Sequence, residues 1–319
     1  MASETGLAPV FLVGAARSGT SLLFRTLALH PDATWLSNWV QRFPAAPQLT
    51  VLNAVCRALP ERRARVWFGA DGDNAYVYGA KRTWRDRLLP QPVEAETLYR
   101  RAGVPELGTE PGEPVPDEAV EQLRQCLRTA SRWDRRQVHV AKRIANNRRI
   151  PLLLHAFPEA RFVEIVRDGR AVAASLSKVD WWAESDVWWY GGNPESWRED
   201  GGDEWALCAR NWVEEVRAVR EGLQQVAPDR VLSMTYEELV ADPHETLERV
   251  VGFSGLDLKS SGFRRALERV RFPDKNDRWR TDLDTAALAT VEQIQRPELV
   301  HYGYQLITQP DADPSLGAS

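Results

Sequence analysis

The stretch VFLVGAARSGTSLL, residues 10–23, decides the fold of this chain. An apolar run typical of a buried strand ends at Gly14, and a helix-like pattern resumes after Gly19. The phosphate loop of nucleotide hydrolases, G-x-x-x-x-G-K-[ST], has the same glycine spacing and a lysine after the second glycine. Here Thr20 occupies that lysine position, and the nearest cation is Arg17, inside the loop. The sequence therefore predicts a strand, an anion-binding turn and a helix, without the lysine that reaches the outer phosphates of ATP.

Composition and charge limit the classes of protein to which the chain can belong. The 319 residues are 43% hydrophobic and carry a formal net charge of −4, which suits one large globular domain. A net negative chain is a poor candidate for coating nucleic acid or an anionic membrane. Three widely separated cysteines predict neither a disulfide framework nor a zinc site. No apolar run is long enough for a membrane span and no signal peptide is visible, so we expect a cytoplasmic protein. The oligomeric state is not indicated.

Strand-like and helix-like segments alternate along the chain, which predicts an α/β fold with a central parallel sheet. The expected strands are Val10–Val13, Thr34–Leu36, Val138–Ala141, Arg161–Val166 and Val231–Met234; the expected helices are Thr20–Leu29, Asn147–Ala156, Asp203–Val226, Pro243–Gly252 and Asp284–Gln295. Residues 43–133 do not fit the alternation and are predicted to form a mainly helical capping insertion within a single domain, 1–319. Inside it, the proline-rich stretch Pro90–Pro116 is predicted to be irregular. The tail, residues 309–319, is predicted to be disordered.

The turn after the first strand has the chemistry of an anion site. Backbone N–H groups and the positive end of the helix dipole converge where a glycine-containing turn enters a helix. Thr20 and Ser21 add hydroxyl donors, and Arg17 adds a planar cation suited to sulfate or phosphate oxygens. The alternative is that Gly14 and Gly19 only shape a strand-to-helix turn. The run of arginine and hydroxyl residues inside the loop favours the anion site.

A second segment, RFVEIVRDGRAVAASLSKV at residues 161–179, repeats this arrangement. Arg167 follows a buried strand, and a helix that begins near Asp168 would place Ser175 about two turns along it. Both side chains could then face a phosphate. The alternative is a salt-bridged helix cap, with Asp168 at the helix N-terminus and both arginines, Arg167 and Arg170, in solvent.

Together these segments resemble the sulfotransferases that use 3′-phosphoadenosine 5′-phosphosulfate (PAPS). The first resembles their 5′-phosphosulfate loop, P-R-S-G-T-[ST]-L in Golgi tyrosylprotein-type enzymes and many bacterial members, with Ala16 in place of the proline. The second resembles their 3′-phosphate motif, an arginine followed eight positions later by a serine, here Arg167 and Ser175. Between them VAKRIANN, residues 140–147, is similar to the K-[DTS]-P segment, whose lysine, here Lys142, steadies the sulfuryl group.

Two further segments extend the resemblance to residue 280. YEELVADP, residues 236–243, is similar to Y-E-[DE]-L-x-x-x-P, and KNDRWR, residues 275–280, is similar to the [KR]-W element that closes over the nucleotide. The resemblance implies a P-loop NTPase-like three-layer fold, PAPS as donor, 3′-phosphoadenosine 5′-phosphate (PAP) as product, and no metal. It implies that the cofactor-binding residues are Arg17, Ser18, Gly19, Thr20, Ser21, Arg167, Ser175, Tyr236, Arg278 and Trp279. Arg17 and Lys142 are the implied catalytic residues, because their charges would stabilise the sulfuryl oxygens.

The resemblance also explains the missing lysine, because PAPS carries its sulfuryl group on a single 5′-phosphate. It implies a sulfotransferase acting on a hydroxyl, or as second choice an amine, of a small-molecule or glycan acceptor. Two alternatives stay open. One is a P-loop kinase or NTPase, against which the absent lysine stands; the other is a catalytically inactive module that only binds the nucleotide.

The general base is not evident from the sequence. Tyrosylprotein-type and heparan-type relatives place a glutamate shortly after the first helix, but here the window Trp35–Val40 has no carboxylate. A positioned carboxylate or histidine elsewhere could take the proton; the candidates are His30, Asp32, Glu94, Glu96, Asp180, Glu184 and Asp186. Otherwise the acceptor must be acidic enough, as a phenol is, to need little help.

An aromatic cluster follows the second segment. DWWAESDVWWYGGNPESW, residues 180–197, contains Trp181, Trp182, Trp188, Trp189, Tyr190 and Trp197. Many of these rings are expected to fill a core. The functional alternative is a wall or lid for a sugar or a flat aromatic acceptor, with Gly191-Gly192 as its hinge.

Overall fold

The structure is a computed structural model that describes residues 8–69, 88–105, 114–136 and 138–308. The chain divides into two compact units. The first comprises Met1–Arg167 and Glu215–Lys275, and the second comprises Asp168–Glu214 and Asn276–Ser319. The predicted tail, residues 309–319, lies outside the described residues. Among the described helices, none is both long and apolar enough to cross a lipid bilayer.

The first unit is built on a five-stranded sheet in the order β2-β3-β1-β4-β5. Its strands are β1 (Val10–Val13), β2 (Ala33–Thr34), β3 (Val138–Lys142), β4 (Arg161–Val166) and β5 (Val231–Thr235). All neighbouring strands are parallel, and Leu12 of β1 lies in register with Lys142 of β3 and Val163 of β4. The prediction of an α/β fold with a central parallel sheet is confirmed.

Helices cover both faces of this sheet. They are α1 (Thr20–Ala28), α2 (Asn38–Arg42), η1 (Pro47–Leu52), α3 (Asn53–Ala58), α4 (Pro60–Phe68), α6 (Glu96–Arg101), α7 (Asp117–Asp134), η2 (Ile144–Asn147), α8 (Ile150–Ala156), η3 (Pro228–Arg230), α12 (Tyr236–Ala241), α13 (Pro243–Phe253) and α14 (Ser261–Leu267), where η denotes a 3₁₀ helix. A long helix, α11 (Glu204–Leu223), begins in the second unit and ends in the first.

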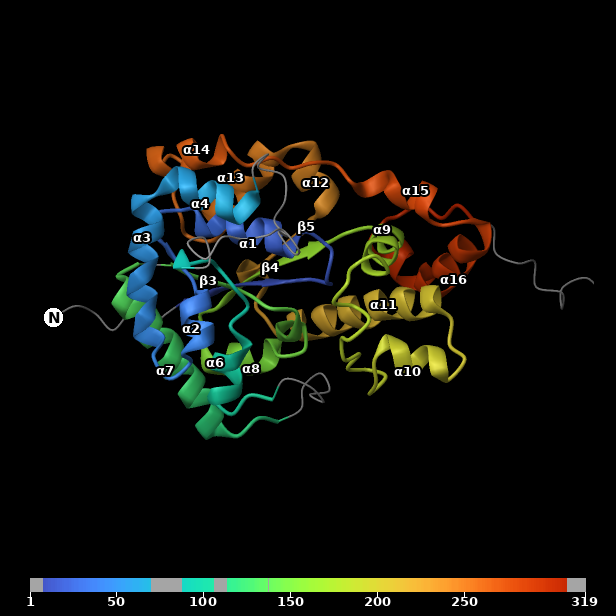
Figure 1. Cartoon of the computed structure of the whole chain (residues 1–319), viewed down its shortest axis with the longest axis horizontal. Helices are drawn as coiled ribbons and strands as arrows, with labels where there is room; N and C mark the ends of the chain where they lie inside the picture. Colours follow the sequence, from blue (N-terminus) through green and yellow to red (C-terminus); the bar gives the residue numbers. More distant parts are fainter. Residues whose placement is uncertain (1–7, 70–87, 106–113, 137, 309–319) are drawn as a thin grey trace, which may run out of the picture. The chain divides into compact units, whose positions relative to one another are not determined.

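Two apolar cores form because successive strand residues point to opposite faces. Val10 and Leu12 belong to a core shared with α1, α4, α13 and α14. Phe11 and Val13 belong to a second core shared with α6, α7 and α8. Figure 1 shows α1, α4 and α13 on one side of the strands and α6 and α8 on the other. The first unit therefore has the three layers that the sequence predicts.

Two local predictions about the first unit are wrong. The second strand ends at Thr34 and does not continue to Leu36, because Ser37 instead pairs with Pro92 of a distant segment. The stretch Pro90–Pro116 is not irregular throughout, since it contains α6. Local composition misled here, because α6 is stabilised by apolar side chains that it buries in the second core.

The second unit is helical in its described residues. It contains α9 (Gly169–Leu176), α10 (Pro194–Glu199), the first part of α11, η4 (Asn276–Arg278), α15 (Trp279–Asp282) and α16 (Thr285–His301). Asp168 caps α9 by accepting from the Arg170 N–H at 2.9 Å. The Arg170 side chain is buried and donates to Asp168 and to Glu292. The salt-bridged cap weighed as the alternative therefore exists, but Arg170 lies in the interior of this unit and not in solvent.

A buried histidine on β3 makes folding sensitive to acid. His139 is fully buried, its Nδ1 lies 3.2 Å from Ser131 Oγ, and burial lowers its pKa from 6.5 to about 4 although Asp134 opposes the shift. The unfolded chain then binds the proton more readily than the folded chain. The stability that His139 contributes is complete above pH 6.5 and is lost as the pH falls from 6.5 towards 4.

We expect His139→Leu to remove this part of the acid sensitivity. Between pH 7 and pH 4.5 the wild type should lose roughly 2–3 kcal/mol more unfolding free energy than the variant. Urea unfolding at several pH values measures the difference. Equal losses in both proteins would show that His139 is not responsible.

Candidate active site

Four strands of the first unit end at one edge of the sheet. β1 leads into Gly14, β3 ends at Lys142, β4 leads into Arg167, and β5 leads into Tyr236. β1 lies between β3 and β4, so the chain crosses over in opposite directions on either side of it. In open α/β sheets ligands bind outside the carboxyl ends of the strands at such a switch point. The sequence-predicted residues of this unit thus come from the edge where a ligand site is expected.

The loop between β1 and α1 requires both of its glycines. Gly14 has φ +142°, and a Cβ there would lie 2.2 Å from the Ile165 carbonyl oxygen. Gly19 has φ +91°, and a Cβ there would lie 2.7 Å from a ring carbon of Tyr236. Arg17 adopts φ +69°, a conformation that non-glycine residues rarely accept. The loop is held in a strained shape that local preference alone would not produce.

The same loop presents unsatisfied donors. The N-cap residue of α1 is Gly19, which has no side chain to cap the helix, and the first N–H groups of α1 have no acceptors within the helix. Ser18 is fully buried, and its Oγ has no hydrogen-bond partner among the described residues. Thr20 is also buried, at the first position of α1. Orphaned donors around a glycine cradle are what an anionic phosphosulfate group needs, so the loop fits the group that the sequence predicts.

A clamp that the sequence did not reveal fixes the start of the loop. Asn147 Oδ1 accepts from the Gly14 N–H at 3.0 Å, and its Nδ2 donates to the Gly14 carbonyl at 3.1 Å. The same Nδ2 lies 2.6 Å from Glu215 Oε2, and Arg148 pairs with the other oxygen of Glu215 at 3.4 Å. All three side chains are buried. The only sequence signal was a run of polar residues after a strand end, which does not identify Asn147.

Arg167 holds the loop from the neighbouring strand. Its Nη1 donates to the Arg17 carbonyl at 3.0 Å, and its Nη2 donates to the Lys275 carbonyl at 2.8 Å. Its guanidinium lies 4.4 Å from the ring centroid of Tyr236, whose hydroxyl donates to the Pro273 carbonyl at 2.8 Å. Arg167 therefore joins the loop, α12 and the segment that ends at Lys275. This structural role adds to the phosphate contact predicted for it.

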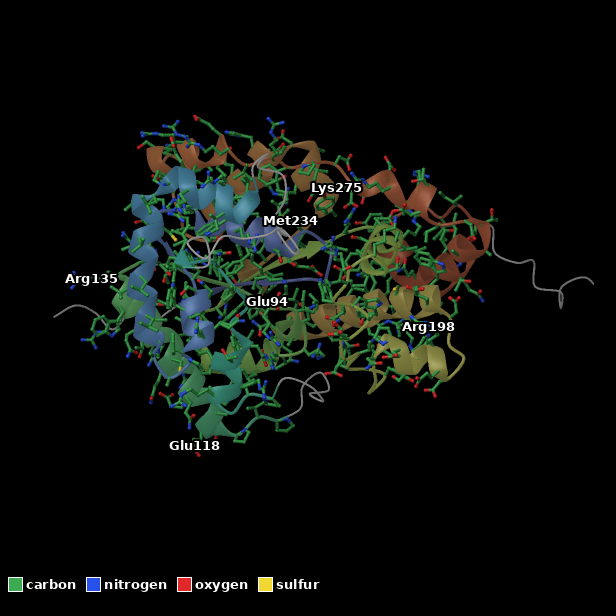
Figure 2. All side chains as sticks on the ribbon, in the orientation of Figure 1. Glu94, Glu118, Arg135, Arg198, Met234 and Lys275 are labelled. Atoms are coloured by element: carbon green, nitrogen blue, oxygen red, sulfur yellow. The ribbon has the colours of Figure 1, made fainter. Side chains whose placement is uncertain are left out.

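Lys142 meets a carboxylate at the end of β3. Its side chain is 2% exposed, and its Nζ donates to Glu94 Oε1. The other oxygen of Glu94 accepts from the Ile144 N–H at 3.3 Å and lies 3.7 Å from an Arg143 nitrogen. The Glu94 side chain is 38% exposed, so one side of the pair remains open to solvent. Figure 2 labels Glu94.

Glu94 reaches Lys142 from the segment that pairs with the window lacking a carboxylate. The Asn38 N–H donates to the Gln91 carbonyl at 3.1 Å, and the Val93 N–H donates to the Leu36 carbonyl at 3.1 Å. The next residue, Ala95, is fully buried with φ +49°. A carboxylate therefore lies in the strand-like segment beside residues 35–40, and a residue with positive φ follows it.

Electrostatics keep Glu94 ionised. Partial burial would raise the pKa of Glu94, but Lys142 and Arg143 outweigh it and hold that pKa below its usual range. Glu96, a second glutamate named from the sequence, has a different partner, since both of its oxygens accept from the buried Arg149 at 3.1 and 3.2 Å. Glu96 is therefore a structural partner of Arg149, whereas Glu94 is a charged group that solvent reaches.

Two other base candidates of the first unit are placed away from this pair. His30 is fully buried, and its Nε2 lies 2.9 Å from the Asp257 carbonyl oxygen, behind the C-terminal end of α1. Asp32 uses its backbone N–H to donate to His30 Nδ1 at 3.0 Å. Asp180, Glu184 and Asp186 belong to the second unit.

The remaining predicted site residues lie in the second unit. Ser175 is on α9, Arg278 ends η4, and Trp279 begins α15. Trp279 is 2% exposed, and the guanidiniums of Arg170 and Arg280 lie 4.4 and 4.5 Å from its ring centroid. The described geometry makes Trp279 part of the core of this unit.

The aromatic cluster packs largely against itself. Trp189, Tyr190 and Trp197 make mutual ring contacts with centroids 5.0 to 6.3 Å apart, and Trp182 is buried in the core of the second unit. Gly191 has φ +77° with open space at its Cβ position. This agrees with core filling for several of these rings; a role in acceptor binding stays a prediction.

Two known proteins are similar to this chain in sequence. Omega-hydroxy-beta-dihydromenaquinone-9 sulfotransferase Stf3 of Mycobacterium tuberculosis (strain CDC 1551 / Oshkosh) is 26% identical over 258 residues, 80% of this chain and 65% of that protein. Protein-tyrosine sulfotransferase of Drosophila melanogaster is 27% identical over 101 residues, 32% of this chain and 17% of that protein. The chain thus spans just under two thirds of the length of the first relative.

Solved structures agree at the level of the fold. Sulfotransferase STF9 from Mycobacterium avium matches with a TM-score of 0.59 at 17% identity, covering 95% of this chain and 79% of that one. The sulfotransferase domain from the curacin biosynthetic pathway matches with a TM-score of 0.52 at 13% identity, covering 94% and 99%. The model of the sulfotransferase family matches residues 9–260, from β1 to beyond α13. The chain belongs to the sulfotransferase family.

Proposed function

We propose that this sulfotransferase takes the sulfuryl group from PAPS and transfers it to a hydroxyl of a small-molecule or glycan acceptor. One observation carries the proposal. The loop between β1 and α1, residues 14–19 and called the phosphate loop below, comes from a strand end adjacent to those of Lys142 and Arg167 in one unit. A relative at 26% identity is named for an omega-hydroxy substrate, which supports a hydroxyl acceptor.

The loop residues would hold the donor. The N–H groups of Gly19, Thr20 and Ser21 and the hydroxyl of Ser18 would bind the 5′-phosphosulfate end, with Arg17 beside it. We assign the 3′-phosphate to Arg167 and a nucleotide contact to Tyr236. The resemblance implies Ser175 and Arg278 for the same ligand, whereas Trp279 is 2% exposed in the core of the second unit. PAPS supplies an activated sulfuryl group on a phosphate leaving group; the protein supplies charge and position.

We assign the proton of the acceptor hydroxyl to Glu94. An attacking hydroxyl must lose its proton as the new oxygen–sulfur bond forms, and a positioned carboxylate accepts it. Glu94 is ionised, open to solvent on one side and adjacent to Lys142. Among the described carboxylates of the first unit, it is therefore the one best placed to act as the base.

The ion pair gives this proton transfer a second effect. While Glu94 is charged, it shares the positive charge of Lys142. When Glu94 takes the proton it becomes neutral, and the charge of Lys142 is released for the oxygens of the transferring group. Proton transfer and electrostatic stabilisation would then strengthen together, at the moment when negative charge builds up.

Calorimetry with PAP tests the donor assignment. We expect the wild type to bind PAP and Arg167→Ala to weaken that binding about 100-fold. The variant would lose two charge-assisted hydrogen bonds to the 3′-phosphate, and the loop between β1 and α1 would lose the hydrogen bond that Arg167 donates to the Arg17 carbonyl. Arg161→Ala is the matched control. Arg161 lies at the other end of β4 and also donates to a backbone carbonyl, that of Phe253 at 2.7 Å, so its loss should change affinity less than twofold, about the scatter of such titrations.

A kinase or NTPase and an inactive nucleotide-binding module would each give a different binding result. Absence of PAP binding by the wild type would refute the proposal, and tight binding of ATP with Mg²⁺ instead would favour the kinase or NTPase. PAP binding without turnover of any acceptor would favour the inactive module.

A further inference from the structure

A cavity in the first unit has the character of a ligand site. It measures about 310 Å³ and lies between the end of α1, α4 and α14. Four arginines and one glutamate line it, namely Arg57, Arg63, Arg265, Arg269 and Glu61, and its other walls are apolar residues and a glycine. The nine residues of α1 separate this end of the helix from the phosphate loop, a length of about 13 Å. It is therefore distinct from the proposed donor site.

Two of the four arginines have anionic partners. Arg57 forms two hydrogen bonds of 2.6 Å with the carboxylate of Asp134. Arg269 pairs with Glu61 at 3.1 Å. Their charges are compensated within the protein.

Arg63 has no carboxylate partner among the described residues. Its side chain is buried, with the residue 5% exposed, and its Nε has no hydrogen-bond partner among the described residues. The adjacent Cys56 is not an anion, because burial raises the pKa of its thiol to about 12 and its Sγ donates to the Pro90 carbonyl. The guanidinium lies 5.5 Å from the ring centroid of Trp67, which offsets only a small part of the cost of burying a charge.

This charge persists at neutral pH. Burial, reinforced by Arg57, lowers the pKa of Arg63 to about 10. Arg265 adds a second cation at the rim, and within the described part of the chain no carboxylate pairs with it. A buried, unpaired cation facing a cavity is costly unless something anionic binds there.

We propose that this cavity binds a small organic dianion, with Arg63 as its inner contact and Arg265 as its outer contact. Two uncompensated positive charges match two negative charges, and the apolar walls accommodate a short carbon body. The volume is at the lower end of that of small-molecule sites. Dicarboxylates and phosphate monoesters share this chemistry.

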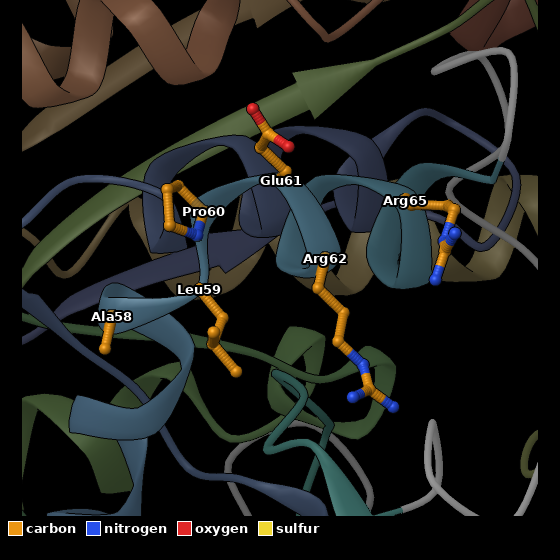
Figure 3. A pocket seen from close by; sticks show the side chains of 6 residues that line it. All are labelled: Ala58, Leu59, Pro60, Glu61, Arg62 and Arg65. Atoms are coloured by element: carbon orange, nitrogen blue, oxygen red, sulfur yellow. The ribbon is translucent and has the colours of Figure 1, made fainter.

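A neighbouring hollow has no buried arginine in its lining. It measures about 650 Å³, and all six of its lining residues come from the single stretch 58–65. Figure 3 shows Arg62 pointing to the opposite side of α4 from Glu61, with Arg65 further along the helix. Arg65 is exposed, and so it provides a control on the same helix as Arg63.

Calorimetric titration of the full chain with glycerol 3-phosphate and with succinate tests the proposal. We expect at least one of these dianions to bind with a Kd below about 1 mM, and glycerol and propionate to bind at least tenfold more weakly. Arg63→Met should weaken dianion binding at least about 30-fold, and Arg65→Met should leave it unchanged. Arg63→Met should also unfold at a temperature no lower than the wild type, because it removes an uncompensated buried charge.

Arg265→Met keeps the test decisive if Arg63→Met does not fold, because this exposed side chain contributes charge to the rim and little to the core. It should weaken dianion binding severalfold. Saturating PAP should leave the dianion titration unchanged. Three results would overturn the proposal: no binding of either dianion to the wild type, equal binding to the arginine variants, or loss of binding when PAP is present.

Discussion

Glu94→Gln should lower kcat about 10²- to 10³-fold for an aliphatic alcohol acceptor, because the variant keeps the size of the side chain and loses the ability to accept a proton. The affinity for PAP should change little, since Glu94 contacts Lys142 and the backbone of Ile144, not the phosphate loop. Steady-state kinetics with a saturating donor, together with calorimetry, separate these two effects. Glu118→Gln, at an exposed glutamate on α7 that Figure 2 labels, is the control and should behave as the wild type.

The acidity of the acceptor distinguishes a base from a residue that only positions Lys142. A phenol such as 4-nitrophenol gives up its proton readily, so the defect of Glu94→Gln should shrink at least tenfold with that acceptor. A residue that only orients Lys142 would affect both acceptors equally, because Lys142 acts on the sulfuryl oxygens in either reaction. An equal loss of kcat with both acceptors would therefore remove Glu94 from the role of base.

The parts of the site that the sequence predicted are those encoded within a single segment. A strand end, a glycine turn and the start of a helix occupy consecutive residues, so the loop at 10–23 could be recognised from its spacing. Lys142 and Arg167 follow buried strands in the same way. Parallel strands bring their carboxyl ends to one edge, so the gathering of these residues followed from the fold class.

The parts that the sequence did not predict depend on contacts between distant segments. Glu94 precedes Lys142 by 48 residues, and its position depends on the pairing of Ser37 with Pro92. Asn147 reaches Gly14 across 133 residues. Neither contact leaves a local pattern, because each requires only a single polar side chain at the right place. Glu94 was one of seven candidates until the fold placed it beside Lys142.

Lys142→Met should lower kcat about 10²- to 10³-fold, and it should weaken PAP binding much less. The buried ammonium group of Lys142 is expected to stabilise charge that develops on the sulfuryl oxygens during transfer, and the loss of one such donor typically has this effect. Methionine keeps the apolar stem, so β3 should retain its packing. Lys142→Arg should recover only part of the rate, because a planar guanidinium does not reproduce a compact ammonium charge. A PAP affinity that falls as much as kcat would place Lys142 in ground-state binding instead.

The ion pair between Lys142 and Glu94 predicts a pH effect in Lys142→Met and the behaviour of the double variant that combines it with Glu94→Gln. Lys142 helps to hold the pKa of Glu94 below its usual range, so that pKa should rise when Lys142 is lost. The acid limb of the residual activity of Lys142→Met should therefore lie at a higher pH than that of the wild type. If protonation of Glu94 releases the charge of Lys142, the two residues act as a unit, and the double variant should be less impaired than the product of the two single defects. Strictly multiplicative defects would show that the base and the cation work independently, and that their ion pair has no part in catalysis.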